Sequence, residues 1–190
     1  MRKVVMINRV SIDGYFASNN KMTGGMDWFV QDPNVEEAVH KLVTSDTLLI
    51  GEITFELFEK SWVPMLKDPN TPAPLKAVAQ ELTDMRKIVF AKNIGQSDWA
   101  NTEFHHDGLV EFVKELKKEE GTDILIMGSG TIVQQLTNEC LIDDYVFIVS
   151  PVVAGGGKAL FKNVGQQSLQ FVSAESFESG NVVLHYQLVK

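Results

Sequence analysis

The chain has 190 residues, 44% of them hydrophobic, and its 17 lysine and arginine residues are outnumbered by 25 acidic residues. A chain of this length can bury one sizeable core, so we expect a single domain spanning residues 1–190. The net charge of −8 argues against a nucleic-acid partner, because phosphate backbones require a basic face. The one cysteine excludes an intrachain disulfide and a cysteine-rich metal site.

The sequence also argues against membrane insertion and secretion. No apolar run approaches the roughly 18 to 20 residues that span a bilayer. The first ten residues, MRKVVMINRV, are typical of a strand and too short for a signal peptide. We therefore expect a cytoplasmic protein that makes no membrane contact.

The first third of the chain alternates strands and helices. A strand is predicted at 3–10, followed by a long loop at 11–33 that is rich in Gly, Asn, Asp and Ser. Loops of that length inside a compact domain are usually functional or mobile. A helix is expected from Asn34, a buried strand at 47–50, and the start of another helix at 54–58.

Proline residues organise the next segment. Four of them fall between Ser61 and Pro74, and we expect a surface excursion there. Pro74 suits the first turn of the following helix, because its missing N–H is not needed at that position. A third strand is predicted at 88–90. Asp107 is expected to be the N-cap of a helix that ends at Gly121.

The most informative segment follows this helix. Residues 123–127 are apolar at nearly every position, as in a strand buried on both faces, and they end in Gly128-Ser129-Gly130. Small residues let a ligand approach the backbone, and a helix starting at Thr131 would direct its free N–H groups toward a phosphate. The same pattern is also an ordinary way to turn a tight βα corner. Cys140, on the predicted helix, is expected to be a buried structural thiol.

After residue 143 the helical pattern disappears. Three strand-like runs, at 145–153, 169–177 and 182–189, have no helix between them, and we expect antiparallel strands at the edge of the sheet. His185 falls in an alternating run and is interpreted as a sheet residue. Strands and helices thus alternate over most of the chain, which predicts an α/β layered fold.

Five segments now carry a resemblance to a known family. They are SIDGYFA at 11–17, LLIGEITFE at 48–56, KIVFAKN at 87–93, DILIMGSGTIVQQL at 123–136 and DDYVFIVSPVVAGGGKALF at 143–161. In this order and spacing they resemble the dihydrofolate reductase-like superfamily, most closely the C-terminal reductase domain of the riboflavin-biosynthesis protein RibD. The resemblance implies a three-layer α/β/α sandwich, with a mostly parallel central sheet and antiparallel C-terminal strands. It also implies a homodimer and NADPH lying across the carboxyl ends of the strands.

The resemblance further implies where the cofactor binds. Segments that match the family by position would contact the pyrophosphate, the adenosine ribose with its 2′-phosphate, and the nicotinamide carboxamide. For the pyrophosphate these residues are Gly51, Thr54, Gly128, Ser129, Gly130, Thr131 and Ile132; for the adenosine ribose, Ala91 and Lys92; for the carboxamide, Phe16 and Ala17. Residues 19–28 match the mobile loop that closes over the reacting centre. The bond between Gly128 and Ser129 is expected to be cis, as it often is in the family.

One position departs from the family pattern. Where relatives usually carry an arginine for the 2′-phosphate, this chain has Glu52. A carboxylate beside a phosphate is repulsive. Either Lys92 or another cation compensates, or the preference for NADPH over NADH is weakened, so NADH is not excluded.

The candidate catalytic residues are Asp13 and Glu36. Hydride transfer needs a proton for the adjacent heteroatom, and true dihydrofolate reductases carry one substrate-binding acid early in the helix after the mobile loop. Glu36 is nearest to that position, although it also suits the first turn of a helix. Asp13-Gly14 is equally interpretable as a turn, which we favour. Arg9 is the one arginine suggestive of a substrate-phosphate contact.

The resemblance therefore predicts an NAD(P)H-dependent reductase of a small heterocyclic, pteridine- or aminopyrimidine-like substrate. The activity would be similar to that of 5-amino-6-(5-phosphoribosylamino)uracil reductase. The chain has no zinc-deaminase motif, and we expect no metal: His105-His106 are interpreted as surface residues, and Gly155-Gly156-Gly157 as a strand-to-strand turn. The alternatives are a non-catalytic nucleotide-binding module and a structural homodimer on the same fold.

Overall fold

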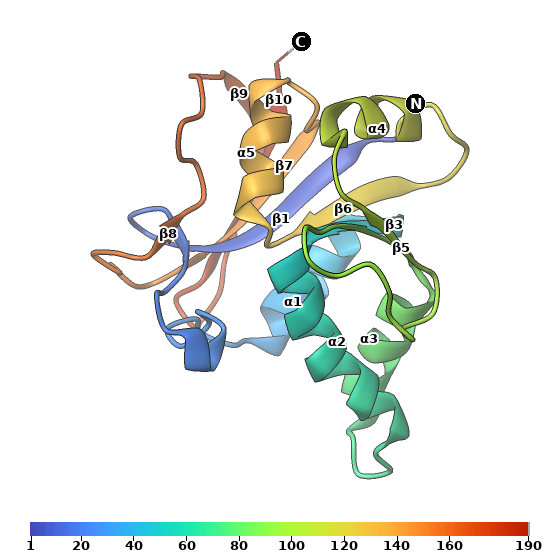
Figure 1. The fold of residues 1–190 in the computed structure, drawn as a ribbon. Coiled ribbons are helices and arrows are strands. Elements are labelled where there is room, and N and C mark those ends of the chain that lie inside the picture. Colours follow the sequence, from blue (N-terminus) through green and yellow to red (C-terminus); the bar gives the residue numbers. More distant parts are fainter. Residues whose placement is uncertain (190) are drawn as a thin grey trace.

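A single twisted sheet organises the computed structural model, which describes residues 1–189 except for the side chain of Lys21. Its eight strands lie in the order β5-β4-β3-β6-β1-β7-β10-β9 (Figure 1). Their bounds are β1 Val4–Ser11, β3 Ser45–Gly51, β4 Arg86–Phe90, β5 Thr102–His105, β6 Asp123–Met127, β7 Asp144–Ser150, β9 Leu169–Ser176 and β10 Val182–Leu188. All neighbours are parallel except β10, which runs antiparallel to both β7 and β9.

Helices cover both faces of this sheet (Figure 1). Helices α1 (Pro33–Leu42), α2 (Glu52–Lys67) and α3 (Ala73–Asp84) pack on one face, and α4 (Leu109–Leu116) and α5 (Gly130–Asn138) pack on the other. Side chains of β1 alternate between the two cores: Val4 and Met6 join the α4–α5 cluster, and Val5 and Ile7 join the α1–α3 cluster. The predicted three-layer α/β/α fold with a mostly parallel sheet is confirmed.

Strand β6 lies near the middle of the sheet, between β3 and β1. Ile124 and Ile126 are fully buried on one face, and Leu125 is 8% exposed on the other. The apolar run at 123–127 thus correctly predicted a strand that is buried on both faces. Its carboxyl end opens at the same edge of the sheet as those of β1, β3 and β4, because these strands are parallel.

The direction of β7 corrects one expectation. The run that begins at Tyr145 was predicted to be antiparallel, but β7 runs parallel to β1, from the pair Asp144–Val5 to the pair Ser150–Ser11. The reason is that α5 connects β6 to β7 across one face of the sheet, and such a crossover returns the chain in the same direction. Antiparallel pairing starts only with β10.

Helix α2 corrects a second expectation. The predicted surface excursion at 61–74 is wrong in its first half, because α2 continues to Lys67 with Pro64 inside it. Pro64 removes one hydrogen bond inside the helix, and Trp62 and Val63, which pack on the α1–α3 core, keep this segment helical. Pro69 and Pro72 do separate α2 from α3, and Pro74 lies in the first turn of α3, as predicted.

Smaller boundaries also differ from the sequence expectation. The N-cap of α4 is Gly108, with φ 70°, and not Asp107; the helix ends at Leu116, well before Gly121. Cys140 is exposed just beyond α5, with φ 54°, and is therefore not a buried thiol. Strand β5 was not predicted, since its four residues are all half-buried and lack a continuous apolar run.

Two short strands lie outside the main sheet. Strand β2 (Tyr15–Ala17) pairs antiparallel with β8 (Lys158–Ala159), and a 3₁₀ turn, η1 (Lys21–Thr23), follows β2. The glycines at 155–157 lie between β7 and β8, as predicted. Among the described residues, no helix has the length and apolar character needed to cross a membrane.

One buried cation holds β4 against the end of α3. Lys87 is fully buried, and its Nζ donates hydrogen bonds to the carbonyl oxygens of Leu82 (2.8 Å), Thr83 (2.9 Å) and Met85 (2.8 Å). The same Nζ lies 4.8 Å from the centre of the Trp99 ring. Burial lowers the pKa of Lys87 to about 8, although Asp84 opposes the shift.

This pKa predicts a pH-dependent contribution to stability. Between the folded pKa near 8 and the usual value of 10.5, the unfolded chain holds a proton on Lys87 that the folded chain has released. As the pH increases through this range, the free energy of unfolding of the native protein should therefore rise relative to that of Lys87→Met. The rise is at most about 1.4 kcal/mol per pH unit. Urea unfolding followed by circular dichroism measures both proteins. Parallel pH profiles would contradict the assignment.

Candidate nucleotide site at the carboxyl edge of the sheet

The turn after β6 forms the centre of the candidate site. Gly128 has φ 61° and Ser129 has φ 55°, so two successive residues adopt the left-handed conformation before α5 begins. The predicted cis bond between them is wrong, since the described chain contains no cis peptide bond. A trans bond joins Gly128 and Ser129, and both residues adopt left-handed conformations.

Three strand ends converge on this turn. The Oγ of Ser129 accepts a hydrogen bond from the Gly51 amide (2.8 Å), and the Ser129 amide donates to Thr54 Oγ1 (3.2 Å). The Asn8 side chain, 4% exposed on β1, donates to the Gly128 carbonyl (3.2 Å). The structure thus brings together Gly51, Thr54 and the turn, as the sequence resemblance implied.

Asn8 was missed from the sequence. It is the polar residue inside the apolar run VVMIN, and that interruption is the signal that could have indicated it. A buried amide in a strand needs a hydrogen-bond partner. Here the partner is the carbonyl of the turn, so Asn8 fixes the orientation of the peptide that follows β6.

The glycine positions are required by close contacts. A Cβ atom on Gly128 would lie 3.1 Å from Thr54 Oγ1, at a residue whose φ already disfavours a side chain. A Cβ atom on Gly130 would lie 2.7 Å from two ring carbons of Phe16. The Phe16 ring therefore lies directly against the start of α5, and the predicted nicotinamide and pyrophosphate segments meet.

The first turn of α5 offers hydrogen-bond donors. In the chain as described, residues 1–189, the backbone amides of Gly130 and Thr131 have no hydrogen-bond partner. The amides of Ile132 and Val133 donate to the Ser129 carbonyl instead (2.9 and 3.1 Å). Two free N–H groups at the positive end of a nine-residue helix suit a phosphate or pyrophosphate group. Ile132, only 2% exposed, supports the turn from the core.

Beside this turn, the carboxyl ends of β3 and β4 carry Glu52 and Lys92. Glu52 Oε2 accepts hydrogen bonds from the amides of Lys92 (2.8 Å) and Asn93 (3.3 Å), and Oε1 accepts one from Asn93 Nδ2 (3.0 Å). The hydrogen bond from the Lys92 amide, followed by the Asn93 side chain, lowers the pKa of Glu52 below its usual value. Ala91 is buried at the end of β4.

Asp13 connects two loops. Its Oδ1 accepts a hydrogen bond from the Ala154 amide (2.9 Å), and its Oδ2 accepts one from the Gly155 amide (2.8 Å). Hydrogen bonds, first from the Ser11 side chain and then from Ala154, lower the pKa of Asp13 to about 2. The carboxylate therefore holds the first loop to the loop after β7.

Glu36 lies in the first turn of α1, at 56% side-chain exposure, and forms an ion pair with Arg9 at the end of β1. Arg9 also donates to the Val30 carbonyl (3.3 Å). Asp32 is the N-cap of α1 and accepts a hydrogen bond from the Asn34 amide (2.9 Å). Arg9 and Glu36, the two charged residues that the sequence suggested for the substrate, thus neutralise one another beside the first loop.

Ala17 and the histidine pair His105-His106 are each engaged in packing or hydrogen bonds within the fold. Ala17 is 5% exposed and pairs with Lys158 in the small β2–β8 sheet. His105 packs against the rings of Phe90 and Phe112, which also contact each other. The Nδ1 of His106 lies 2.8 Å from the Ala91 carbonyl. Each histidine is therefore engaged with the end of β4 or its neighbours.

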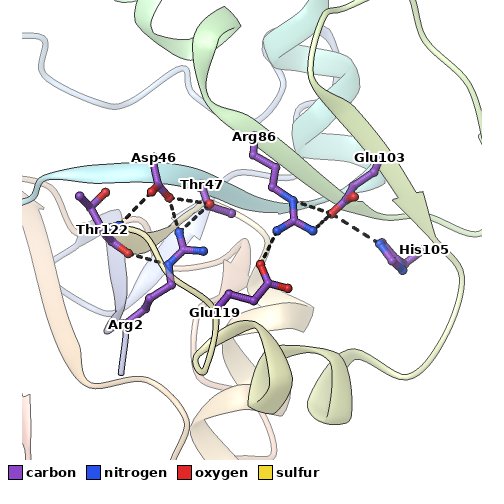
Figure 2. A network of polar contacts seen from close by, with 8 residues as sticks. All are labelled: Arg2, Asp46, Thr47, Arg86, Glu103, His105, Glu119 and Thr122. Atoms are coloured by element: carbon purple, nitrogen blue, oxygen red, sulfur yellow. Dashed lines mark hydrogen bonds and ion pairs between the residues drawn. The ribbon is translucent and has the colours of Figure 1, made fainter.

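A polar hollow of about 610 Å³ lies at the opposite, amino edge of the sheet. Figure 2 shows its charged side chains paired: Arg86 with Glu103 and Glu119, and Arg2 with Asp46. Arg2 also donates to Thr47 Oγ1 and the Thr122 carbonyl (both 2.6 Å). Because these cations are already neutralised, the hollow has no free positive group for an anion, unlike the start of α5.

The geometry defines an α/β protein with a left-handed turn and two free backbone amides at the carboxyl edge of a parallel sheet. The family model of the RibD C-terminal domain matches residues 2–183, and the chain belongs to this family. The five spaced segments therefore predicted the family correctly. Reductases share both this family and this fold.

Individual relatives agree with this assignment. The uncharacterized protein YyaP of Bacillus subtilis (strain 168) is 31% identical over 186 residues, which cover 97% of this chain and 94% of the relative. A putative riboflavin biosynthesis protein from Shewanella sp. PV-4 superposes with a TM-score of 0.72 at 19% identity, covering 99% of both chains. A dihydrofolate reductase from Enterococcus faecalis, complexed with NADP(H), superposes with a TM-score of 0.65 at 15% identity, covering 99% of this chain and 97% of that one. The structural matches establish the fold.

The hydrogen bonds of Ser129 predict a measurable cost of removal. Ser129→Ala leaves the Gly51 amide without its partner and should lower the free energy of unfolding by about 1 to 3 kcal/mol. Gln135→Ala, an exposed change in the same helix, is the matched control and should alter it by less than about 0.5 kcal/mol. Denaturant unfolding of the two variants makes the comparison. Equal stabilities would contradict the role assigned to the Ser129 hydroxyl.

Proposed function

We propose that this protein is an oxidoreductase that reduces a small heterocyclic, pteridine- or aminopyrimidine-like substrate with hydride from a reduced nicotinamide dinucleotide. The observation that carries the proposal is the pair of free amides at Gly130 and Thr131, at the end of a left-handed turn held by Ser129 and Thr54. Membership of the RibD C-terminal domain family supports it. NADPH is the form of the cofactor that the resemblance implies.

The residues of the site have distinct tasks under this proposal. The bound cofactor supplies the hydride. The protein therefore has to bind the cofactor and the substrate, orient them and exclude water. The first turn of α5 holds the pyrophosphate through backbone N–H groups. The Phe16 ring, packed on Gly130, places the first loop beside the same helix end, where that loop can cover the nicotinamide half.

The two candidate acids differ in what they offer. Asp13 positions the loop after β7: a pKa of about 2 keeps it ionised at neutral pH, so it has no proton to donate. Glu36 is the acid proposed to contact the substrate, because its side chain is exposed and Arg9 fixes its carboxylate beside the first loop. A heterocycle bearing amino groups would suit a carboxylate held in this way.

We also propose a homodimer formed through the C-terminal strands. Strand β9 is the last strand of the sheet, and seven of its eight residues are exposed. Phe171 is 58% exposed and Val172 is 42% exposed. An unpaired edge strand with apolar side chains and no lysine or proline is a surface on which a second copy can pair.

Charge at the start of α5 tests cofactor binding. Thr131→Glu places a carboxylate on an exposed first-turn position, where it stabilises the helix but repels a pyrophosphate. We expect a loss of affinity for NADH and NADPH of about tenfold or more, with unchanged or higher thermal stability. Thr131→Gln, which has the same shape without the charge, should bind nearly as the native protein does.

Quenching of the tryptophan fluorescence and calorimetry both measure this binding. The proposal fails if neither cofactor binds to the native protein at millimolar concentration. It also fails if Thr131→Glu binds both cofactors as tightly as Thr131→Gln, because the pyrophosphate would then lie elsewhere.

Light scattering after size-exclusion chromatography tests the dimer. We expect twice the chain mass of 21.2 kDa at micromolar concentration, and a monomer for Phe171→Lys, which places a charge on β9. Ile53→Lys, at a residue of α2 that is 64% exposed, is the control and should remain dimeric. A native monomer would contradict this part of the proposal.

A further inference from the structure

The turn at the end of β4 already contains a carboxylate. Glu52, the first residue of α2, accepts three hydrogen bonds there, two of them from the backbone amides of Lys92 and Asn93. Backbone amides of this kind are the donors that a phosphate would use. In this chain they are occupied by a side chain from the neighbouring strand end.

The position of this turn relates it to the dinucleotide site. Strand β3 lies between β6 and β4, so the turn after β6, Glu52 and Lys92 lie on three adjacent strand ends along one edge. A dinucleotide with its pyrophosphate at the start of α5 and one nucleoside toward the first loop would have its other nucleoside over β3 and β4, where Glu52 lies.

The charges at this turn do not favour a further phosphate. Lys92 contributes one positive charge and Glu52 one negative charge, and no ion pair joins their side chains in the described residues. A 2′-phosphate at this turn would add about two negative charges beside the Glu52 carboxylate, and the amides of Lys92 and Asn93 are already occupied by that carboxylate. Desolvation on binding would increase the repulsion.

A ribose diol suits the same place. An ionised carboxylate has about four acceptor positions, and three at Glu52 are taken, two on Oε2 and one on Oε1. The remaining position on Oε1 can accept a hydrogen bond from a ribose hydroxyl. Carboxylates at strand ends recognise the 2′-hydroxyl of NAD in this way in other α/β proteins.

From this geometry we infer that Glu52 selects a nicotinamide dinucleotide without a 2′-phosphate, so that the protein binds NADH in preference to NADPH. This inference rests on the proposed function, because it requires that a nicotinamide dinucleotide binds at this edge. It departs from the cofactor that the family resemblance implies, and the departure is carried by one residue of this chain.

Binding titrations with NADH and NADPH test the selection, with nucleotide fluorescence as the readout and no substrate present. We expect the native protein to bind NADH about tenfold or more tightly than NADPH at low salt, and the difference to shrink in molar salt. Glu52→Gln should tighten NADPH binding by about tenfold while NADH affinity stays equal or falls. Glu52→Arg should reverse the preference.

Glu56→Gln is the matched control. Glu56 is exposed on α2, one turn further along, and the substitution removes the same net charge without touching the amides of Lys92 and Asn93. Its NADH-to-NADPH ratio should equal that of the native protein. Thermal unfolding of each variant verifies that the protein is still folded when the hydrogen bonds of Glu52 to the turn at Lys92 are changed.

The outcomes separate this inference from the proposed function. Equal or tighter native binding of NADPH overturns the inference and leaves the reductase proposal standing. A preference for NADH that Glu52→Gln leaves unchanged also overturns it, as does an equal loss of both affinities, which a purely structural role for Glu52 predicts. Absence of binding by either cofactor overturns both proposals.

Discussion

The hydroxyl of Ser129 is the interaction on which the candidate site depends. It joins the turn after β6 to the Gly51 amide at the end of β3, while the Ser129 amide joins the same turn to Thr54 at the start of α2. With Asn8 holding the Gly128 carbonyl, a left-handed turn is fixed from three sides. The first amides of α5 are then left without partners at this edge of the sheet, and the proposed anion site rests on them.

The net charge of −8 restricts how such a protein binds an anionic ligand. The arginines at 2, 9 and 86 are each paired with a carboxylate, so they do not attract phosphate. Under the proposed function, the backbone dipoles at the start of α5 attract the pyrophosphate without adding positive charge. At the neighbouring strand end the Glu52 carboxylate occupies the amide of Lys92, and under our inference it favours the nicotinamide dinucleotide that has no 2′-phosphate.

Much of the fold could be predicted because local pattern and burial agree. The apolar run at 123–127, the glycine turn after it and the helix from 130 follow from one stretch of sequence, and the segments around them identify the family. The failures occur where distant contacts override local signals. Pro64 is helical because Trp62 and Val63 pack on the core, and β5 is a strand because it pairs with β4, although its sequence has no apolar run. The sequence likewise cannot show that Asp13 and Ala154, distant along the chain, share a hydrogen bond.

Residue types and their spacing were therefore enough to indicate an α/β protein, its family and the turn at 128–130, because these depend on periodicity, glycine and the order of short segments. The tertiary structure alone decided which groups of the site are free and which are engaged. The Gly130 and Thr131 amides are open, Glu52 holds the turn at Lys92, and Asp13 and Glu36 are paired with groups from other loops and strands. Hydrogen bonds between residues far apart in the chain depend on how the strands are ordered in the sheet, and that order is set by packing across both faces.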